Sequence, residues 1–251
     1  MVNSHSAAQG RRPATPPAAT LRLSVVVPVY NEAATLEDIL RRLRLVPLAL
    51  EVIAVDDCSR DESPAILARL LAEGVVDRVL RHEVNRGKGA ALRTGFAAAT
   101  GDVIVPQDAD LEYDPYDFVA MLDVLARDEA DAVYGSRFLK GRFHGRYLGH
   151  LIGNRVLTWW SNRWTGLGLT DMETCYKMVR APLLTSLVLT TDRFGIEPEI
   201  TARLAQAGAR VVEVPVSYAG RSFEAGKKIT WKDGLAGLLH VVHFSLVRPT
   251  R

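Results

Sequence analysis

Short apolar runs that do not alternate with polar residues recur through the first half of the chain, each followed by a segment with helical spacing. The run Leu23–Tyr30 is rich in β-branched residues, which is typical of a strand buried on both faces of a parallel sheet. Across Asn31–Arg44 the apolar residues recur every three or four positions, which predicts a helix with one buried face. The first unit is therefore a strand followed by a helix.

The same alternation of strand and helix repeats as far as residue 134. The pattern predicts further strands at Glu51–Val55, Val76–Arg81, Asp102–Pro106 and Ala132–Tyr134, and helices at Pro64–Glu73, Gly89–Thr100 and Asp117–Arg127. Strands that alternate with helices imply parallel crossover units. We therefore predict an α/β fold with a doubly wound, mostly parallel sheet.

No low-complexity linker divides the chain, so we expect one domain over residues 21–251, with 137–251 as its elaborated second half. Residues 1–20 are rich in Ala, Pro, Ser and Arg and lack the apolar core of a signal peptide, which predicts a disordered leader. The apolar stretch Gly234–Val247 contains two histidines and is shorter than the roughly 18 residues that span a bilayer. We expect no transmembrane segment.

Composition is that of a globular protein, with 48% hydrophobic and 24% charged residues, which excludes a wholly disordered, collagen-like or coiled-coil chain. Cys58 and Cys175 are the only cysteines, too few for a disulfide framework, and no zinc-ligand spacing occurs. We therefore expect a reduced, cytoplasmic setting.

The net charge of +2 conceals an asymmetry between the two halves of the chain. Residues 1–136 carry 14 basic and 21 acidic side chains, whereas residues 137–251 carry 17 basic and 8 acidic ones. A basic half points to phosphates, an anionic membrane surface or nucleic acid as a partner. The alternative is two solvated faces that differ by chance.

Four carboxylates follow two of the predicted strands. Asp56 and Asp57 follow one strand, and Asp108 and Asp110 follow another. Ligands of doubly wound sheets bind outside the carboxyl ends of the strands, so we expect these side chains at one rim. Asp108 and Asp110 point to the same side and suit one hard cation, Mg²⁺ or Mn²⁺, that bridges a nucleotide diphosphate. The alternative for this pair is a polar turn.

The loops after these strands carry further polar residues. Asp56 and Asp57 are expected to accept hydrogen bonds from a ribose hydroxyl or a base N–H. Ser59, Asp61 and Ser63 are expected to cap the helix that starts near residue 64. The segment 85–89, which includes Lys88, places two glycines and two cations before a helix and is a candidate phosphate cradle without the Walker spacing.

An ordered series of motifs resembles glycosyltransferase family 2. The motifs are Val26-Val-Pro-Val-Tyr-Asn-Glu32, Val55-Asp-Asp-Cys-Ser-Arg-Asp61, Asn85-Arg-Gly-Lys-Gly-Ala90, Asp108-Ala-Asp110 and Val214-Pro-Val with Arg221 and Gly-Lys-Lys228. They cover about residues 23–240 and are similar to those of the polyprenyl-phosphate group, the dolichyl-phosphate mannose or glucose synthases. The resemblance implies a Rossmann-like GT-A fold, a UDP- or GDP-sugar donor, a divalent cation and inversion at the anomeric carbon.

The resemblance also implies roles for individual residues. The nucleotide sugar would be bound by Pro28, Tyr30, Glu32, Asp56, Asp57, Lys88, Asp108 and Ala109, and the metal by Asp108 and Asp110 with Glu112 as a third candidate ligand. The acceptor phosphate would be bound by Arg137, Arg221, Lys227 and Lys228. Asp110, Glu197 and Arg221 are the catalytic candidates. Cys58 stands where the family has Gly, which raises a question about the geometry of that turn.

Glu197, in Phe194-Gly-Ile-Glu-Pro-Glu199, is the one candidate for a general base. A phosphate acceptor is already anionic near neutral pH, so positioning and leaving-group stabilisation would suffice without a base. Glu197 would then bind a sugar hydroxyl, or simply lie at the start of a helix. The nearby segment Asp171–Lys177 is interpreted as acceptor-side or sheet-edge structure, with Cys175 as a packed residue.

Apolar and aromatic residues cluster over His150–Trp164 and are interleaved with Arg155 and Arg163, as in a helix that lies in a membrane interface. The alternative is a core helix. Nucleic acid is not expected, because the strand-end carboxylates would repel a phosphate backbone.

Together these features predict an inverting hexosyltransferase that acts on a polyprenyl monophosphate and lies peripherally on the cytoplasmic membrane face. Residues 21–136 would form its nucleotide and metal half, and 137–251 its acceptor and membrane half. A homo-oligomer is left open. The rival hypotheses are transfer to a saccharide or small-molecule hydroxyl, and a non-catalytic nucleotide-sugar-binding scaffold.

Overall fold

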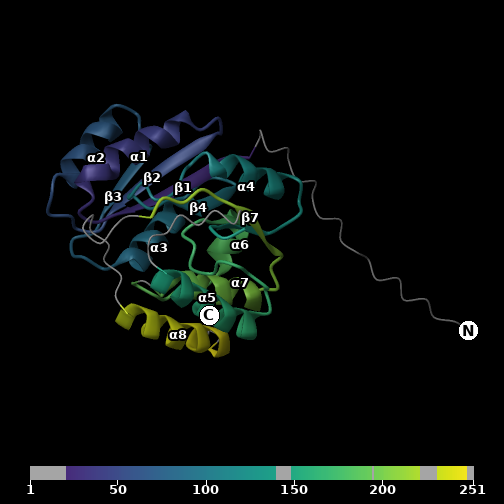
Figure 1. Ribbon diagram of the computed structural model, residues 1–251. Coiled ribbons are helices and arrows are strands. Elements are labelled where there is room, and N and C mark those ends of the chain that lie inside the picture. Colours follow the sequence, from purple (N-terminus) through teal and green to yellow (C-terminus); the bar gives the residue numbers. More distant parts are fainter. Residues whose placement is uncertain (1–20, 140–147, 194, 221–230, 248–251) are drawn as a thin grey trace, which may run out of the picture.

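The computed structural model describes residues 21–139, 148–193, 195–220 and 231–247, and within them one seven-stranded sheet has helices on both faces (Figure 1). The strand order is β3-β2-β1-β4-β6-β5-β7. The predicted leader, residues 1–20, lies outside the described residues.

The first half of the chain forms the elements that the apolar pattern predicts. They are β1 (Leu23–Val29), α1 (Ala33–Leu45), β2 (Leu50–Asp56), α2 (Ser63–Ala72), β3 (Arg78–Arg81), α3 (Lys88–Ala98), β4 (Val103–Pro106), α4 (Asp117–Ala126) and β5 (Ala132–Ser136). β1 pairs in parallel with β2 on one side and with β4 on the other. The predicted α/β fold with a doubly wound, mostly parallel sheet is confirmed.

The second half adds α5 (Leu148–Thr165), β6 (Lys177–Arg180), α6 (Ala181–Ser186), α7 (Ile196–Gln206), β7 (Val211–Pro215) and α8 (Trp231–Leu246). β6 lies between β4 and β5 and is antiparallel to both. β6 has four residues and begins and ends with a basic side chain, and the apolar pattern did not predict it. α7 includes Glu197 in its first turn, so Glu197 does lie at the start of a helix.

The sheet separates two hydrophobic cores, and β1 contributes to both. Val25 and Val27 pack into the core under α1, α2 and α4, whereas Val26 packs into the core on the side of α3 and α7. This arrangement explains why β1 is apolar without alternation. α3 approaches the sheet closely, because a Cβ atom at Gly95 would overlap Cγ1 of Val26.

α5 and α8 lie side by side at the outer edge of the core on the side of α3 and α7 (Figure 1). Leu157 and Trp160 of α5 pack against that core, whereas Ile152, Val156 and Trp159 are exposed. The helix predicted at His150–Trp164 therefore has one packed face and one exposed apolar face. No helix within the described ranges is both long and apolar enough to cross a bilayer.

The close contact of α3 with β1 predicts the effect of adding one methyl group. Gly95→Ala should lower the free energy of unfolding by about 1–3 kcal/mol, because the new Cβ overlaps the side chain of Val26. Gly153→Ala on exposed α5 is the matched control, since a Cβ there meets nothing within 4 Å and should leave stability unchanged or slightly higher. Urea unfolding of both variants tests this, and equal stabilities would contradict it.

Candidate functional site

The predicted carboxylates lie at the carboxyl ends of the two strands that flank β1. The Asp57 amide donates to the Val29 carbonyl oxygen at 2.8 Å, and the Gln107 amide donates to the Val26 oxygen at 2.9 Å. Asp56 and Asp57 therefore follow β2 on one side of β1, and Asp108 and Asp110 follow β4 on the other. The topology of a parallel sheet places them along one rim, as predicted.

The loop after β2 caps the start of α1. The backbone amides of Asn31, Glu32 and Ala33 donate to Ser59 Oγ, Ser63 Oγ and Asp61 Oδ2, at 3.0, 3.1 and 3.0 Å. These three side chains were predicted to cap α2, and that prediction is corrected. Asp61 alone also serves α2, where Oδ1 accepts from the Ser63 amide at 3.0 Å. Because β1 and β2 are neighbours, the loops after them lie together and fix each other.

Cys58 adopts a positive φ of 63°, the left-handed conformation that favours glycine. The substitution of Cys for the family's glycine therefore leaves the turn in a glycine-like conformation. Its thiol donates to the Glu83 carbonyl oxygen at 3.4 Å.

Asp57 is bonded within the chain through both carboxylate oxygens. Oδ1 accepts from the Arg86 amide at 2.9 Å and lies 2.7 Å from His82 Nδ1. Oδ2 accepts from the Gly87 amide at 2.7 Å and from Asn85 Nδ2 at 2.8 Å. The prediction of a phosphate cradle is thus corrected for the amides of Arg86 and Gly87, because these amides bind the carboxylate of Asp57.

Asp56 is buried, but its carboxylate is less fully bonded than that of Asp57. Oδ1 accepts from the Ser59 amide at 2.9 Å, and Oδ2 lies 3.1 Å from Arg81 Nε. Oδ2 accepts no hydrogen bond from the residues that the structure describes. Pro28, in β1, and Glu32, on the loop after β1, are partly exposed, and Tyr30 between them is exposed. Nucleoside binding by this group stays a prediction.

Asp108 and Asp110 provide the oxygen donors for a cation. Asp108 Oδ1 and Oδ2 lie 2.9 and 3.2 Å from Lys88 Nζ, so this carboxylate already attracts a positive charge. Asp110 Oδ1 accepts from the Glu112 amide at 3.1 Å, and the oxygen of buried Ala109 accepts from Thr35 Oγ1 at 2.6 Å. Mg²⁺ is commonly held by one or two carboxylates together with substrate phosphates, so this donor set fits a hard divalent ion.

Glu112 is directed toward another partner. Its Oε2 accepts from the Tyr218 hydroxyl at 2.7 Å, and its carbonyl oxygen accepts from the Ala219 amide at 2.8 Å. Within the described ranges no three His, Cys, Asp or Glu residues are grouped so that they could hold a metal ion. Glu112 thus anchors the segment after β7, and its role as a third metal ligand stays a prediction.

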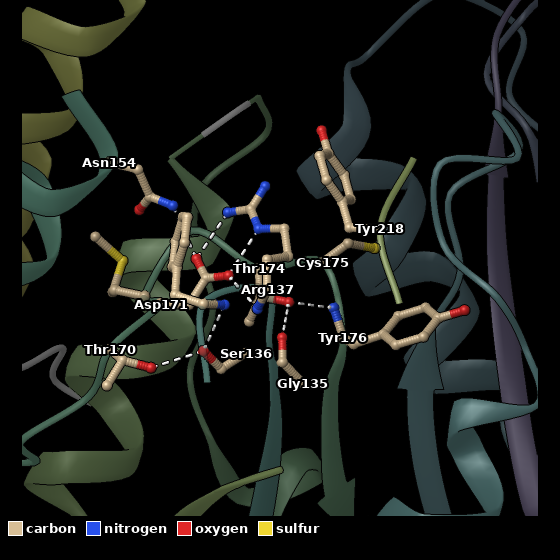
Figure 2. Close-up of polar contacts among 12 residues, drawn as sticks. Gly135, Ser136, Arg137, Asn154, Thr170, Asp171, Thr174, Cys175, Tyr176 and Tyr218 are labelled. Carbon is tan, nitrogen blue, oxygen red and sulfur yellow. Dashed lines mark hydrogen bonds and ion pairs between the residues drawn. The ribbon is translucent and has the colours of Figure 1, made fainter. Parts of the chain in front are cut away.

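Arg137, predicted to bind phosphate, is locked in a two-pronged pair with buried Asp171 (Figure 2). Its Nε and Nη2 donate to the two Asp171 oxygens, each at 2.7 Å, and Asn154 Nδ2 donates to the same carboxylate at 2.9 Å. The guanidinium lies 5.1 Å from the ring centroid of Tyr218. The other predicted phosphate ligands, Arg221, Lys227 and Lys228, lie outside the described residues.

Lys88 connects the metal pair to Glu197. Its Nζ lies 2.9 Å from Asp108 Oδ1 and 3.0 Å from Glu197 Oε1. Burial disfavours the charged ammonium, but Asp108 and Glu197 outweigh it and hold the pKa of Lys88 well above its ordinary value. Glu197, the one candidate general base, is therefore engaged in an ion pair with Lys88.

Three residues before and at the start of β6 join this group, and two of them had no predicted role. Burial and the charge of Glu197 raise the pKa of Glu173 to about 7, and its Oε1 has no hydrogen-bond partner among the residues described. Lys177 is buried, and burial lowers its pKa. Cys175 is packed inside, as predicted, and burial raises its pKa. In the sequence, the sign that Glu173, Cys175 and Lys177 could lie together is their spacing at every second position.

We name these residues the Glu197 cluster; its members are Lys88, Asp108, Glu173, Cys175, Lys177 and Glu197. Asp108 and Lys88 are partly exposed, with 23% and 18% of their side chains accessible. The sequence predicted three of the members as site residues. The structure brings these three into direct contact.

Comparison with known proteins gives a consistent family. Residues 24–184 match the glycosyl transferase family 2 domain. The chain is 32% identical to glycosyltransferase AglD of Haloferax volcanii, over 83% of this chain but 35% of that protein. It is 29% identical to undecaprenyl-phosphate mannosyltransferase of Micrococcus luteus, over 82% of this chain and 87% of that protein. It is also 29% identical to dodecaprenyl-phosphate galacturonate synthase of Rhizobium johnstonii, over 84% of this chain and 63% of that protein. The chain thus spans only part of the first and third relatives.

Solved structures share the fold. Glucosyl-3-phosphoglycerate synthase from Mycobacterium tuberculosis, in complex with Mn²⁺, UDP and phosphoglyceric acid, matches with a TM-score of 0.70 and 20% identity. The match covers 92% of this chain and 81% of the synthase. The same enzyme in complex with phosphoglyceric acid matches with a TM-score of 0.67 and 24% identity, over 91% of this chain and 80% of the synthase. The GT-A fold implied by the sequence motifs is confirmed.

The raised pKa of Glu173 predicts how stability depends on pH. The folded chain holds a proton on Glu173 up to about pH 7, while the unfolded chain releases it near 4.5, so this group costs stability as pH rises between those values. Glu173→Gln removes that cost and should be more stable than the wild type by about 3 kcal/mol at pH 8, with little difference at pH 4.5.

Urea unfolding at pH 4.5, 6 and 8 measures the difference between the two proteins. Glu129→Gln, at an exposed position, should show no such trend. A Glu173→Gln difference that stays constant with pH would contradict the prediction.

Proposed function

Because the chain belongs to glycosyl transferase family 2, we propose that it transfers a hexose from a UDP- or GDP-sugar to a polyprenyl monophosphate, with inversion at the anomeric carbon. The observation that carries the proposal is the carboxylate pair Asp108 and Asp110 at the end of β4, beside the half-buried cation of Lys88. Relatives named as polyprenyl-phosphate sugar transferases support the choice of acceptor.

The donor would bind along the rim. Asp56 is the register partner of Val29, the residue before Tyr30, and its Oδ2 would accept from the nucleoside. Asp108 and Asp110 would hold a divalent cation, which when bound neutralises the charge of the departing diphosphate. The capping of α1 by the β2 loop keeps this surface rigid before the donor arrives, which favours precise orientation.

The acceptor would bind on the other side of β4. An oxygen of its phosphate monoester is anionic near neutral pH and attacks the anomeric carbon as the bond to the nucleoside diphosphate breaks. Asp171 fixes Arg137 through Nε and Nη2, and Nη1 makes no hydrogen bond to the residues described. That edge of the guanidinium would bind the acceptor phosphate, with Arg221, Lys227 and Lys228 as further cations. No general base is needed, which agrees with the pairing of Glu197 to Lys88.

The exposed face of α5 and α8 would lie on the membrane that carries the acceptor. Trp159 of α5 is 64% exposed and Leu239 of α8 is 67% exposed, and both helices present further apolar side chains, namely Ile152, Val156, Trp164 and Leu246. α5 also carries Arg155 and Arg163 and no acidic residue. Apolar anchors among cations suit a surface of anionic lipid. We place this face on the cytoplasmic leaflet.

The catalytic proposal is tested by a donor panel. Transfer of radiolabelled hexose to polyprenyl phosphate, extracted into organic solvent, should require Mg²⁺ or Mn²⁺ and should fall at least about 100-fold in Asp110→Asn. Asp123→Asn, on the exposed side of α4, should keep full activity. Unchanged turnover in Asp110→Asn would refute the metal role, and label that stays aqueous with every donor would refute the acceptor.

The membrane proposal is tested by co-sedimentation with phosphatidylglycerol vesicles. Trp159→Glu and Leu239→Glu should each weaken binding about tenfold, since each removes an apolar anchor and adds a repelling charge. Leu71→Glu, an exposed apolar residue on α2, is the control. Equal weakening by Leu71→Glu, or binding that does not fall with added salt, would show that this face is not the one that docks.

A further inference from the structure

The segment that carries Glu173 is fixed on both sides of this residue. Asp171 is held by Arg137 and Asn154 (Figure 2), and the Met172 amide donates to Thr158 Oγ1 at 3.1 Å. On the other side, Thr174 Oγ1 donates to the Gly135 carbonyl oxygen at 2.6 Å. The backbone thus presents the Glu173 side chain in a defined direction.

That direction is toward the Glu197 cluster. Glu173, Cys175 and Lys177 all lie within reach of the charge of Glu197. The residues between them turn the other way, since Thr174 bonds to Gly135 and the Tyr176 hydroxyl donates to Gln107 Oε1 at 2.6 Å. Glu173 therefore lies near Glu197 and Lys177 of this cluster and also near the Arg137–Asp171 pair, whose charges act on it as well.

Glu173 differs from the buried carboxylates that serve the fold. Glu51, Glu199 and Asp171 each accept at least three hydrogen bonds from side chains or backbone amides. Oε1 of Glu173 accepts none from the described residues, although it is buried. A buried acceptor left unbonded destabilises the folded state, so its retention points to a ligand that supplies the missing donor.

The chemistry of the cluster selects hydroxyl groups as that ligand. Three carboxylates, those of Asp108, Glu173 and Glu197, would repel a phosphate, but each accepts a hydrogen bond from a hydroxyl. The ammonium groups of Lys88 and Lys177 lie among them as donors. A sugar carries hydroxyls that donate and accept at once, so a mixed set of acceptors and donors complements it.

We infer that Glu173 binds a hydroxyl of the donor's hexose and is a specificity-determining residue, an inference that rests on the proposed function. The cluster begins at Asp108, where the donor's diphosphate would be held, so the sugar attached to that diphosphate is the part of the donor nearest Glu173. In the proposed pose the nucleoside would lie at the ends of β1 and β2, on the opposite side of β4 from β6.

Calorimetric titration separates the sugar from the nucleotide. With Mn²⁺ present, UDP, GDP, UDP-glucose, UDP-galactose and GDP-mannose are each titrated into the wild type, Glu173→Gln and Glu173→Asp. Both variants should bind the preferred nucleotide sugar about tenfold more weakly, and should bind the matching nucleoside diphosphate as the wild type does. Glu129→Gln should match the wild type for every ligand.

The outcomes distinguish this inference from the proposal beneath it. If the variants bind nucleotide sugar as tightly as the wild type, or lose nucleoside diphosphate equally, the role of Glu173 is refuted while the transferase proposal stands. If the wild type binds no nucleotide sugar, the proposed function fails and this inference with it. An unfolded variant would lose the nucleoside diphosphate as well, so a selective loss of sugar binding cannot come from unfolding.

Discussion

The carboxylate of Asp57 at the start of α3 is the interaction on which the rest of the site depends. It binds the amides of Arg86 and Gly87 and so fixes the loop that ends at Lys88. Negative charge is stabilised at a helix N-terminus, and here the chain supplies the anion itself. With the loop fixed, Lys88 reaches both Asp108 and Glu197 and joins β4 to α7 through one buried cation. A carboxylate remote from the reacting atoms thus sets the geometry around them.

Much of the fold follows from local pattern in the sequence. β1, β2 and β4 are mostly apolar runs because they are buried between the two cores, and the helices between the strands have a clear period. The apolar pattern did not predict β6, which has only two apolar residues between Lys177 and Arg180. Its antiparallel place between β4 and β5 depends on pairing across the sheet, which no local window contains.

The candidate site divides in the same way. Topology alone brings Asp56 and Asp108 to one rim, because strand ends in a parallel sheet meet there. The partners of those side chains are another matter. Glu112 bonds to Tyr218, which is 106 residues away, and Asp57 bonds to amides about 30 residues away. A sequence motif identifies a carboxylate but not the donors that bond to it. Glu112, one of the predicted metal ligands, and the amides of the predicted phosphate cradle are each bonded to another residue of the chain.

The ion pair of Lys88 with Asp108 also bears on how a cell would control this protein. A carboxylate pair at a strand end would ordinarily need a bound ion to offset its repulsion, and folding would then draw on the same ion as turnover. Here Lys88 already supplies positive charge to Asp108. The amount of folded protein should therefore be independent of the divalent ions in its surroundings. Under the proposed function, scarcity of those ions would slow turnover without depleting the protein.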